Sequence, residues 1–221
     1  MQQSTPFAAI ILCGGESRRM GRAKAMLPWH GRTLLEHVVA TLAPIATPIV
    51  VVAAPEQELP PLPVEVLVVR DAVSGEGPLR GLEAGLSALV GRAEVAFVCG
   101  CDMPEISPTV VAELKKRGQN DLLNRSDPFS AVVIDDAGYW QPLHAFYRVD
   151  LLTALRTALA SGERSPQRWL RTVNPLVVSA ESLRELDPEL RSWRNVNTPG
   201  EYKLLEIEDA ETCSASRKPF Q

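Results

Sequence analysis

The sequence lacks the features of membrane-spanning, secreted and nucleic-acid-binding proteins. Its longest purely apolar run covers only residues 7–13, whereas a membrane-spanning helix needs roughly 20 residues. The N-terminus has neither the basic start nor the cleavage site of a secretory signal. With a net charge of −4, the chain has no general attraction for nucleic acid or anionic lipid. The sequence therefore predicts a cytoplasmic protein that binds neither nucleic acid nor membrane.

Cysteines and histidines are few, and they are not spaced as zinc ligands. The chain contains Cys13, Cys99, Cys101 and Cys213, and His30, His37 and His144. The Cys-x-Cys pair at residues 99–101 has no second pair and no histidine at the spacing of a zinc site. We therefore expect buried free thiols rather than a zinc centre.

Length and composition favour one domain. The chain has 221 residues, of which 45% are hydrophobic, and this is enough to bury a sizeable core. Residues 209–221 are mostly charged or small and show no apolar period, so we expect a disordered tail there. The prediction is a single domain over residues 1–208, without internal repeats.

A strand followed by glycines and cations dominates the N-terminal part. Residues 7–12 are apolar and lead to Gly14 and Gly15, which is typical of a buried parallel strand that enters a loop. Glycines let backbone N–H groups converge on an anion. Four cations follow, namely Arg18, Arg19, Arg22 and Lys24. The combination predicts a polyphosphate site, although the spacing differs from the Walker and dinucleotide motifs and a solvated basic surface is the alternative.

Strands and helices alternate through the first half of the chain. Further buried strands are predicted at residues 49–54, 64–69 and 94–99, and helices at residues 34–42, 78–89 and 108–118. Thr33 and Glu36 form a capping box for the first helix, and Pro78 fits the first turn of the second. This order implies right-handed crossovers and a Rossmann-like three-layer α/β sandwich with a mostly parallel sheet.

The second half is less regular and predicts a small antiparallel or mixed extension of the sheet. Short strands are expected at residues 121–124, 130–134 and 176–179, a turn at residues 136–138, and helices at residues 150–160 and 166–170. A second capping box runs from Thr198 to Glu201. The helix after it is expected to pack Tyr202 and Leu205 inward.

Two aspartates follow predicted strands at the same edge as the glycine loop. Asp71 comes after the third strand and Asp102 after the fourth. Beside a polyphosphate, one or two carboxylates suffice to hold Mg²⁺, which keeps water and phosphate oxygens as its other ligands. We predict that Asp102 is the metal ligand. The alternative for both residues is an ordinary turn aspartate.

Five motifs in order resemble the molybdenum cofactor guanylyltransferase family. They are Leu-Cys-Gly-Gly-x-Ser-x-Arg-Met-Gly-x-x-Lys-x-x-Leu at residues 12–27, Gly-Pro-Leu-x-Gly-Leu at residues 77–82, Cys-Asp-Met-Pro at residues 101–104, Gln-Pro-Leu at residues 141–143 and Asn-Val-Asn-Thr-Pro at residues 195–199. The first motif is shared with many nucleotidyltransferases, and the others narrow the match. The resemblance spans residues 7–206, nearly the whole chain.

The resemblance implies transfer of GMP from GTP to the terminal phosphate of molybdopterin that carries molybdenum, with release of pyrophosphate. It implies Mg²⁺ at Asp102 and charge stabilisation by Lys24, Arg18 and Arg19. The implied nucleotide contacts are Leu12, Cys13, Gly14, Gly15, Lys24, Asp71 and Asp102, and the implied molybdopterin contacts are Pro142, Leu143, Asn195 and Asn197. GTP is expected over CTP, because cytidylyl-transferring relatives carry Ala-Gly in place of Gly14-Gly15. Molybdoenzyme maturation proteins are candidate partners.

The sequence departs from the family pattern at two places, and two other functions stay open. Ala23 replaces the acidic residue or asparagine that usually precedes the loop lysine. Residues 53–55, Ala-Ala-Pro, stand where the family often has an asparagine near the guanine. The same fold also serves cytidylyl and sugar-phosphate nucleotidyltransferases. A non-catalytic nucleotide-binding adaptor for molybdoenzyme maturation is the third interpretation, which the retained Lys24 and Asp102 oppose.

Overall fold

A seven-stranded sheet forms the centre of the computed structural model, which describes residues 7–14, 23–71, 77–124, 130–205 and 207. The strands are β1 (Phe7–Leu12), β4 (Ala46–Ala53), β5 (Leu67–Arg70), β6 (Val95–Gly100), β7 (Ala131–Asp136), β8 (Tyr139–Arg148) and β9 (Leu176–Ser179). Their spatial order is β5-β4-β1-β6-β8-β7-β9. All neighbours are parallel except β8, which is antiparallel to both β6 and β7. The predicted mostly parallel sheet with an antiparallel extension is confirmed.

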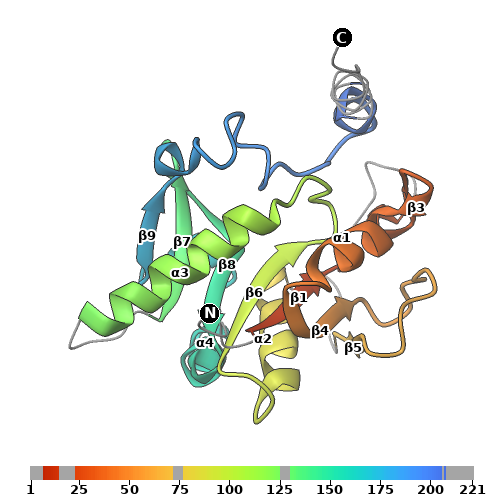
Figure 1. Ribbon diagram of the computed structural model, residues 1–221. Coiled ribbons are helices and arrows are strands. Elements are labelled where there is room, and N and C mark those ends of the chain that lie inside the picture. Colours follow the sequence, from red (N-terminus) through yellow and green to blue (C-terminus); the bar gives the residue numbers. More distant parts are fainter. Residues whose placement is uncertain (1–6, 15–22, 72–76, 125–129, 206, 208–221) are drawn as a thin grey trace.

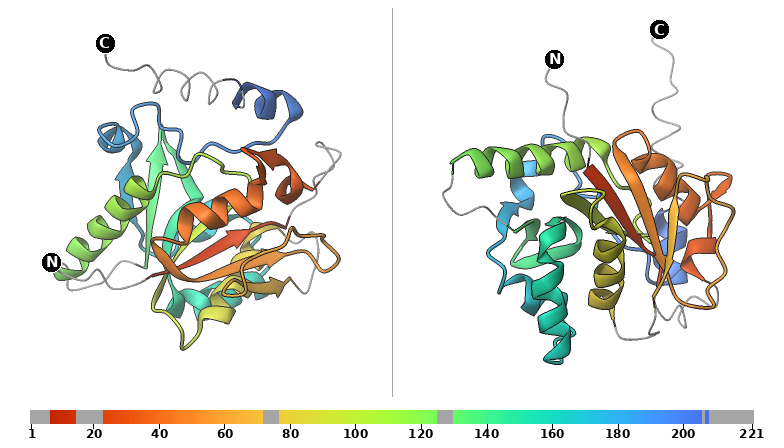
Figure 2. Two further views of the ribbon diagram at one scale, coloured as in Figure 1. Left: turned by 45° about the vertical axis from the view of Figure 1, so that its right-hand side comes forward. Right: turned by 90° about the horizontal axis from the view of Figure 1, so that it is seen from below.

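Helices cover both faces of the sheet (Figures 1 and 2). The helices are α1 (Leu34–Leu42), α2 (Pro78–Leu89), α3 (Pro108–Asn124), α4 (Leu152–Ala160) and α5 (Pro166–Leu170), with short 3-10 helices η2 (Lys24–Met26), η3 (Val149–Leu151) and η4 (Ala180–Leu183). A two-stranded hairpin, β2 (Pro28–Trp29) and β3 (Arg32–Thr33), precedes α1. Helices α1 and α3 lie on one face, and α2 and α4 lie on the other, which gives three layers.

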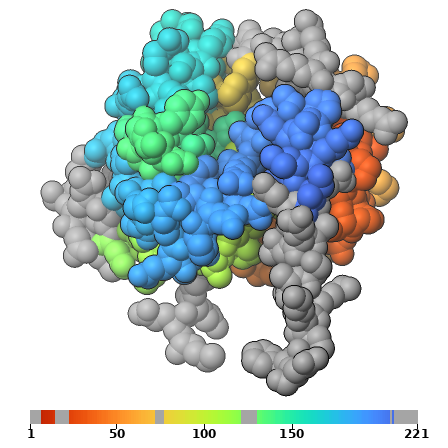
Figure 3. All heavy atoms as spheres, turned by 90° about the horizontal axis from the view of Figure 1, so that it is seen from above, coloured from red at the N-terminus to blue at the C-terminus, as the bar shows by residue number. Residues whose placement is uncertain are grey.

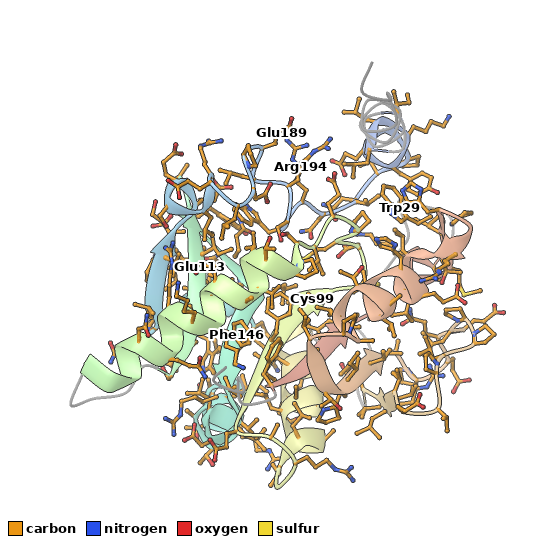
Figure 4. All side chains as sticks on the ribbon, in the orientation of Figure 1. Trp29, Cys99, Glu113, Phe146, Glu189 and Arg194 are labelled. Carbon is orange, nitrogen blue, oxygen red and sulfur yellow. The ribbon has the colours of Figure 1, made fainter. Side chains whose placement is uncertain are left out.

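The central strand β1 is buried on both faces. Ile11 packs with α1 and α3, whereas Ile10 packs with α2 and α4. Cys99 and Phe146, labelled in Figure 4, belong to the core on the α3 side. Helix α2 approaches β1 so closely that a Cβ on Gly85 would lie 2.6 Å from the Ile10 side chain. This central position places the end of β1, and Gly14 after it, between β4 and β6 at the sheet edge.

Local sequence signals place the helix starts as expected. The Thr33 hydroxyl accepts the Glu36 N–H at 3.2 Å, and the Glu36 carboxylate accepts the Thr33 N–H at 2.7 Å. Pro78 occupies the first turn of α2 after Gly77, whose φ of 85° suits glycine. The second capping box is also present, because the Thr198 hydroxyl accepts the Glu201 N–H at 3.2 Å. Capping chemistry is local, and the surrounding fold does not override it here.

Two predictions about the elements are wrong, and one strand was missed. Helix α3 does not end at Gly118 but continues to Asn124, so residues 121–124 are helical and not a strand. An interior glycine costs a helix only about 1 kcal/mol, and buried Val110, Val111 and Leu114 anchor α3 to the sheet. The long strand β8 over residues 139–148 was not predicted.

Pro142 explains why β8 is difficult to recognise. Its ladder with β7 is irregular at this point, because the pair Val133 and Ala145 is followed by Asp135 and Trp140. Proline is tolerated in a strand at such a bulge, where it removes no ladder bond.

Two predicted strand starts also move, from residue 49 to Ala46 in β4 and from residue 64 to Leu67 in β5.

The C-terminal part of the described chain includes a helical stretch over residues 199–205. Leu205 is buried, and Tyr202 packs with it against the hairpin and α1, as predicted. Trp29, labelled in Figure 4, lies beside this stretch with its ring 6.3 Å from that of Tyr202. The predicted tail at residues 209–221 lies outside the described residues. Among the described helices, none has the length and apolarity to cross a membrane.

Candidate functional site

Three chain segments leave the sheet at the same edge. Past the ends of the strands, the Cys13 N–H donates to the Val52 carbonyl at 2.8 Å, and the Cys101 N–H donates to the Leu12 carbonyl at 3.0 Å. The Asp71 N–H donates to the Ala53 carbonyl at 2.8 Å. The structure therefore brings the residues after β1, β5 and β6 together at one carboxyl edge, where open α/β sheets bind their ligands.

Lys24 lies at the centre of this edge. Its ammonium is 2.7 Å from Oδ2 of Asp102 and 2.9 Å from Oδ1 of Asn197. Helix η2 fixes the backbone there, since the Leu27 N–H donates to the Lys24 carbonyl at 3.1 Å. The side chains of Lys24 and Asp102 are each 20% exposed, so a ligand can reach both. The site thus joins a cation, an anion and an amide from three distant parts of the chain.

Gly100 makes room for the carboxylate of Asp102. A Cβ on Gly100 would collide with Oδ1 of Asp102, so glycine at this position lets the carboxylate fold back over the end of β6. The described residues contain no cluster of three or more side chains that could hold a metal ion. A single carboxylate still fits Mg²⁺, because this ion takes most of its ligands from phosphates and water when it accompanies a nucleotide.

Residues 192–197 cross the same edge from β8 to β6. The Ser192 hydroxyl contacts Nε2 of His144 at 3.3 Å and accepts the Ser107 N–H at 2.9 Å. Further along, the Val196 N–H donates to the Asp102 carbonyl at 2.9 Å. In Figure 3 the C-terminal part of the chain (blue) lies between the green surface of β7 and β8 and the orange surface of the hairpin and α1. This crossing carries Asn197 to Lys24.

The residues implied in molybdopterin binding lie near this crossing, in different environments. Leu143 is half-buried and packs against the cores of both faces. The Pro142 carbonyl accepts the Tyr147 hydroxyl at 2.8 Å, while the Asn195 side chain is exposed. Leu143 therefore contributes to the packing of the core. The Asn197 side chain contacts the ammonium of Lys24.

His144 is a structural residue. It is fully buried between Phe97 and Trp193, with ring centroids 4.9 and 6.0 Å away. Burial lowers the pKa of His144 to about 3, so the imidazole is neutral at physiological pH. A group held neutral in the core does not serve as a proton carrier for substrate.

The cysteines of the described chain match the expectation of buried free thiols. Cys13, Cys99 and Cys101 are all buried and unbridged. Burial raises the pKa of the Cys13 and Cys99 thiols well above the usual range, which disfavours the thiolate that a nucleophile or metal ligand requires. Cys213 lies outside the described residues.

The glycine loop is described only at its start. Gly14 is exposed, has no positive φ, and would place a Cβ 3.8 Å from the Ala54 nitrogen, an ordinary contact. Nothing among the described residues therefore requires glycine at this position. Gly15, Arg18 and Arg19 lie outside the described residues, so their predicted contacts with phosphate remain predictions.

Sequence reasoning missed one residue at this edge. The Gln57 carboxamide accepts the Ala54 N–H at 3.1 Å and donates to the Cys13 carbonyl at 3.0 Å. Gln57 lies close to residues 53–55, where the family often has an asparagine that this chain lacks. The signal was a Pro-containing turn directly after a buried strand, at residues 54–57, whose last side chain can fold back onto the strand end.

The fold and the site define a class of protein. A central parallel strand that ends at glycine, with a lysine and a carboxylate across the same edge, is the arrangement of a nucleotide-binding α/β protein. The family described as MobA-like NTP transferase domain matches residues 9–181. The chain belongs to this family and is a nucleotidyltransferase, which confirms the resemblance seen in its motifs.

Named relatives agree with this family. A Mycobacterium tuberculosis protein named "probable molybdenum cofactor guanylyltransferase" is 40% identical over 202 residues, covering 88% of this chain and 90% of that protein. A relative of the same name from Mycobacterium avium is 37% identical over 209 residues, covering 93% of this chain and 98% of that protein. Both are similar over nearly their full length.

Solved structures show the same fold. The molybdopterin-guanine dinucleotide biosynthesis protein A of Archaeoglobus fulgidus has a TM-score of 0.75 at 27% identity, covering 93% of this chain and all of that chain (100%). A 2-C-methyl-D-erythritol 4-phosphate cytidylyltransferase from Thermus thermophilus has a TM-score of 0.60 at 18% identity, covering 91% of this chain and 98% of that chain. The second similarity concerns the fold alone.

Proposed function

We propose that this protein transfers GMP from GTP to the terminal phosphate of molybdopterin carrying molybdenum, releases pyrophosphate, and so forms the molybdopterin guanine dinucleotide cofactor. The observation that carries the proposal is the meeting of Lys24, Asp102 and Asn197 at the carboxyl edge of the sheet. The names of the relatives support the choice of guanylyl transfer.

The reaction asks the protein for alignment and charge stabilisation. An oxygen of the acceptor phosphate forms a bond to the α-phosphorus of GTP, and the bond from that phosphorus to the β-phosphate oxygen breaks. The acceptor is already anionic and brings its own electron pair, so no general base is needed. Lys24 neutralises charge on the α-phosphate and the leaving pyrophosphate. Arg18 and Arg19 add positive charge from the same loop.

Asp102 is the residue that would hold Mg²⁺. When bound, this ion stabilises negative charge on phosphate oxygens as a Lewis acid. Asp102 also orients Lys24 through their ion pair, and its backbone carbonyl accepts the Val196 N–H. This residue therefore connects the nucleotide side and the acceptor side of the edge, through its side chain and its backbone respectively.

The nucleotide and the acceptor occupy opposite parts of the edge in this proposal. Leu12, Cys13, Gly14, Gly15 and Asp71 contact the nucleotide near the ends of β1 and β5. Pro142, Leu143, Asn195 and Asn197 are on the molybdopterin side, near β8 and the crossing segment. The protein acts in the cytoplasm, with molybdoenzyme maturation proteins as candidate partners.

Mass spectrometry of the product tests the proposal directly. The protein is incubated with Mg²⁺, molybdopterin and either GTP or CTP, and the expected product is the guanine dinucleotide. A cytidine product would favour the cytidylyl alternative, which the fold similarity to a cytidylyltransferase makes worth testing. Sugar phosphates offered as acceptors test the other enzymatic alternative. GTP binding without any product would favour the adaptor.

A further inference from the structure

Gln57 completes the ladder at the point where β1 and β4 separate. The ladder continues past β1, since the Cys13 N–H donates to the Val52 carbonyl at 2.8 Å. In a regular parallel ladder, the next bond would join the Ala54 N–H to the Cys13 carbonyl. The Gln57 carboxamide instead bridges these two groups, with bonds of 3.1 and 3.0 Å. A side chain thus takes the place of a direct backbone bond.

The backbone around this carboxamide is firmly held. Residues 54–57 form a tight turn in which the Gln57 N–H donates to the Ala54 carbonyl at 3.2 Å, with Pro55 at its second position. From β5, Nη1 of Arg70 donates to the carbonyls of Ala54 at 3.0 Å and of Gln57 at 2.6 Å. Gln57 itself is half-buried. The Gln57 side chain therefore ties the ends of β1 and β4 together, and the Arg70 side chain ties β5 to the same turn.

Among the described residues, a crossing segment covers the β8 side of the edge and leaves the side of β4 and β5 for the nucleotide base. In the proposed function the phosphates lie at Lys24 and Asp102, beside the ends of β1 and β6. Toward β8, the edge is crossed by residues 192–197, which are bonded to Asp102 and His144. The base therefore extends toward the ends of β4 and β5, where Gly14 is exposed and its Cβ position is 3.8 Å from the Ala54 nitrogen.

We propose that Gln57 is a positioning residue that sets the base specificity of the nucleotide site. The inference rests on the proposed function, because it assumes that a nucleotide binds at this edge. In a direct backbone bond, the Ala54 nitrogen and the Cys13 oxygen would lie about 2.9 Å apart. The carboxamide inserts its own width and two hydrogen bonds, and this separation beside Gly14 makes room for a purine. Placement of the backbone thereby compensates for the missing family asparagine.

Equilibrium binding of GTP and CTP, with Mg²⁺ and without acceptor, tests this role. For Gln57→Ala we expect the preference for GTP over CTP to fall roughly tenfold or more, within the range that steric discrimination by a pocket provides. In steady-state assays the KM for GTP should rise, while kcat stays within about threefold because Lys24 and Asp102 are untouched. Glu56→Ala is the matched control, since Glu56 is an exposed residue of the same turn.

Two further variants separate positioning from folding. Gln57→Met keeps the length of the side chain but removes both hydrogen bonds, so it should lose base preference as Gln57→Ala does. Gln57→Glu keeps an acceptor for the Ala54 N–H but sets a carboxylate against the Cys13 carbonyl, and it should also lose preference. If all three variants unfold at lower temperature yet keep the wild-type ratio of GTP to CTP affinity, the role is structural and the proposal is overturned.

The binding assay also separates this inference from the proposed function. If the wild-type protein prefers GTP and Gln57 variants lose that preference, the inference stands whether or not molybdopterin is the acceptor. If the wild-type protein makes the guanine dinucleotide and the variants keep their preference, the proposed function stands and the inference fails. A wild-type protein without any preference between GTP and CTP would also overturn the inference.

Discussion

Lys24 and Asp102 form an ion pair of 2.7 Å that ties the start of η2 to the carboxyl end of β6. Asn197 is a second acceptor of the same ammonium, at 2.9 Å. GTP phosphates would compete with both side chains for Lys24, so binding exchanges one charge-assisted hydrogen bond for another. Each of the three side chains therefore affects how the other two meet the substrate.

Lys24→Ala should abolish transfer and leave the fold intact. A cation that stabilises developing negative charge is typically worth about 10²–10³ in kcat. The stability cost should be about 1 kcal/mol or less, because a partly exposed ion pair contributes little. Product formation and urea unfolding measure the two effects. Lys116→Ala is the matched control, since Lys116 is 68% exposed and paired with Glu113 on α3. Turnover near wild type in Lys24→Ala would show that Lys24 does not stabilise the phosphates.

Asp102→Asn should remove the metal-dependent activity by weakening Mg²⁺ binding. The amide keeps the size of the side chain and an acceptor for Lys24, but it lacks the charge that a hard cation requires. We expect the Mg²⁺ concentration at half-maximal activity to rise. The control is Asp150→Asn, an exposed aspartate paired with Arg148 at the opposite edge of the sheet. An unchanged half-saturation would assign the metal to another residue.

The sequence alone predicted those elements whose structure depends on residues close to one another in the chain. The capping boxes at Thr33 and Thr198 and the buried strand over residues 7–12 were all recognisable, because hydrogen-bonding side chains and apolar periods are local signals. Gly118 failed as a helix end, since the apolar face of α3 packs against the sheet and outweighs one glycine. Strand β8 was missed because Pro142 concealed a bulge that only its pairing with β7 reveals.

The site was predictable as a set of residues but not as a set of contacts. Because the predicted strands are parallel, the residues that follow β1, β5 and β6 were expected at one edge of the sheet. The contact between Lys24 and Asn197 joins residues 173 positions apart, and no periodicity indicates it. Gln57 was missed for the same reason, since its partner Cys13 is 44 positions away.

Acid should destabilise the fold through His144. Its folded-state pKa of about 3 lies below the ordinary value of 6.5, so the unfolded chain binds the proton first as the pH falls. The stabilising contribution is complete above pH 6.5 and is lost as the pH falls toward 3. Between about pH 7 and about pH 5, the wild-type protein should lose roughly 2 kcal/mol more unfolding free energy than His144→Phe, which cannot be protonated.

Urea unfolding at the two pH values measures this difference. Phenylalanine suits the site because the rings of Phe97 and Trp193 flank it. His30→Gln is the control, since His30 is exposed at the tip of the hairpin, and it should keep the wild-type pH dependence. Equal losses in His144→Phe and the wild type would show that His144 does not carry the effect.

Gly14→Ala should reduce the use of GTP, and the wild-type protein should prefer GTP over CTP. A Cβ at Gly14 would find the Ala54 nitrogen at 3.8 Å and no closer atom among the described residues, so the variant should fold normally. Any loss then arises from the ligand, which a methyl group would crowd beside the strand end. One methyl group typically changes discrimination by about 10- to 200-fold. Pyrophosphate release with GTP and CTP at equal concentration measures the preference. Gly200→Ala is the control, because its Cβ would meet no atom of the described chain nearer than 3.9 Å. CTP preferred by the wild type, or undiminished GTP use in Gly14→Ala, would contradict the assignment.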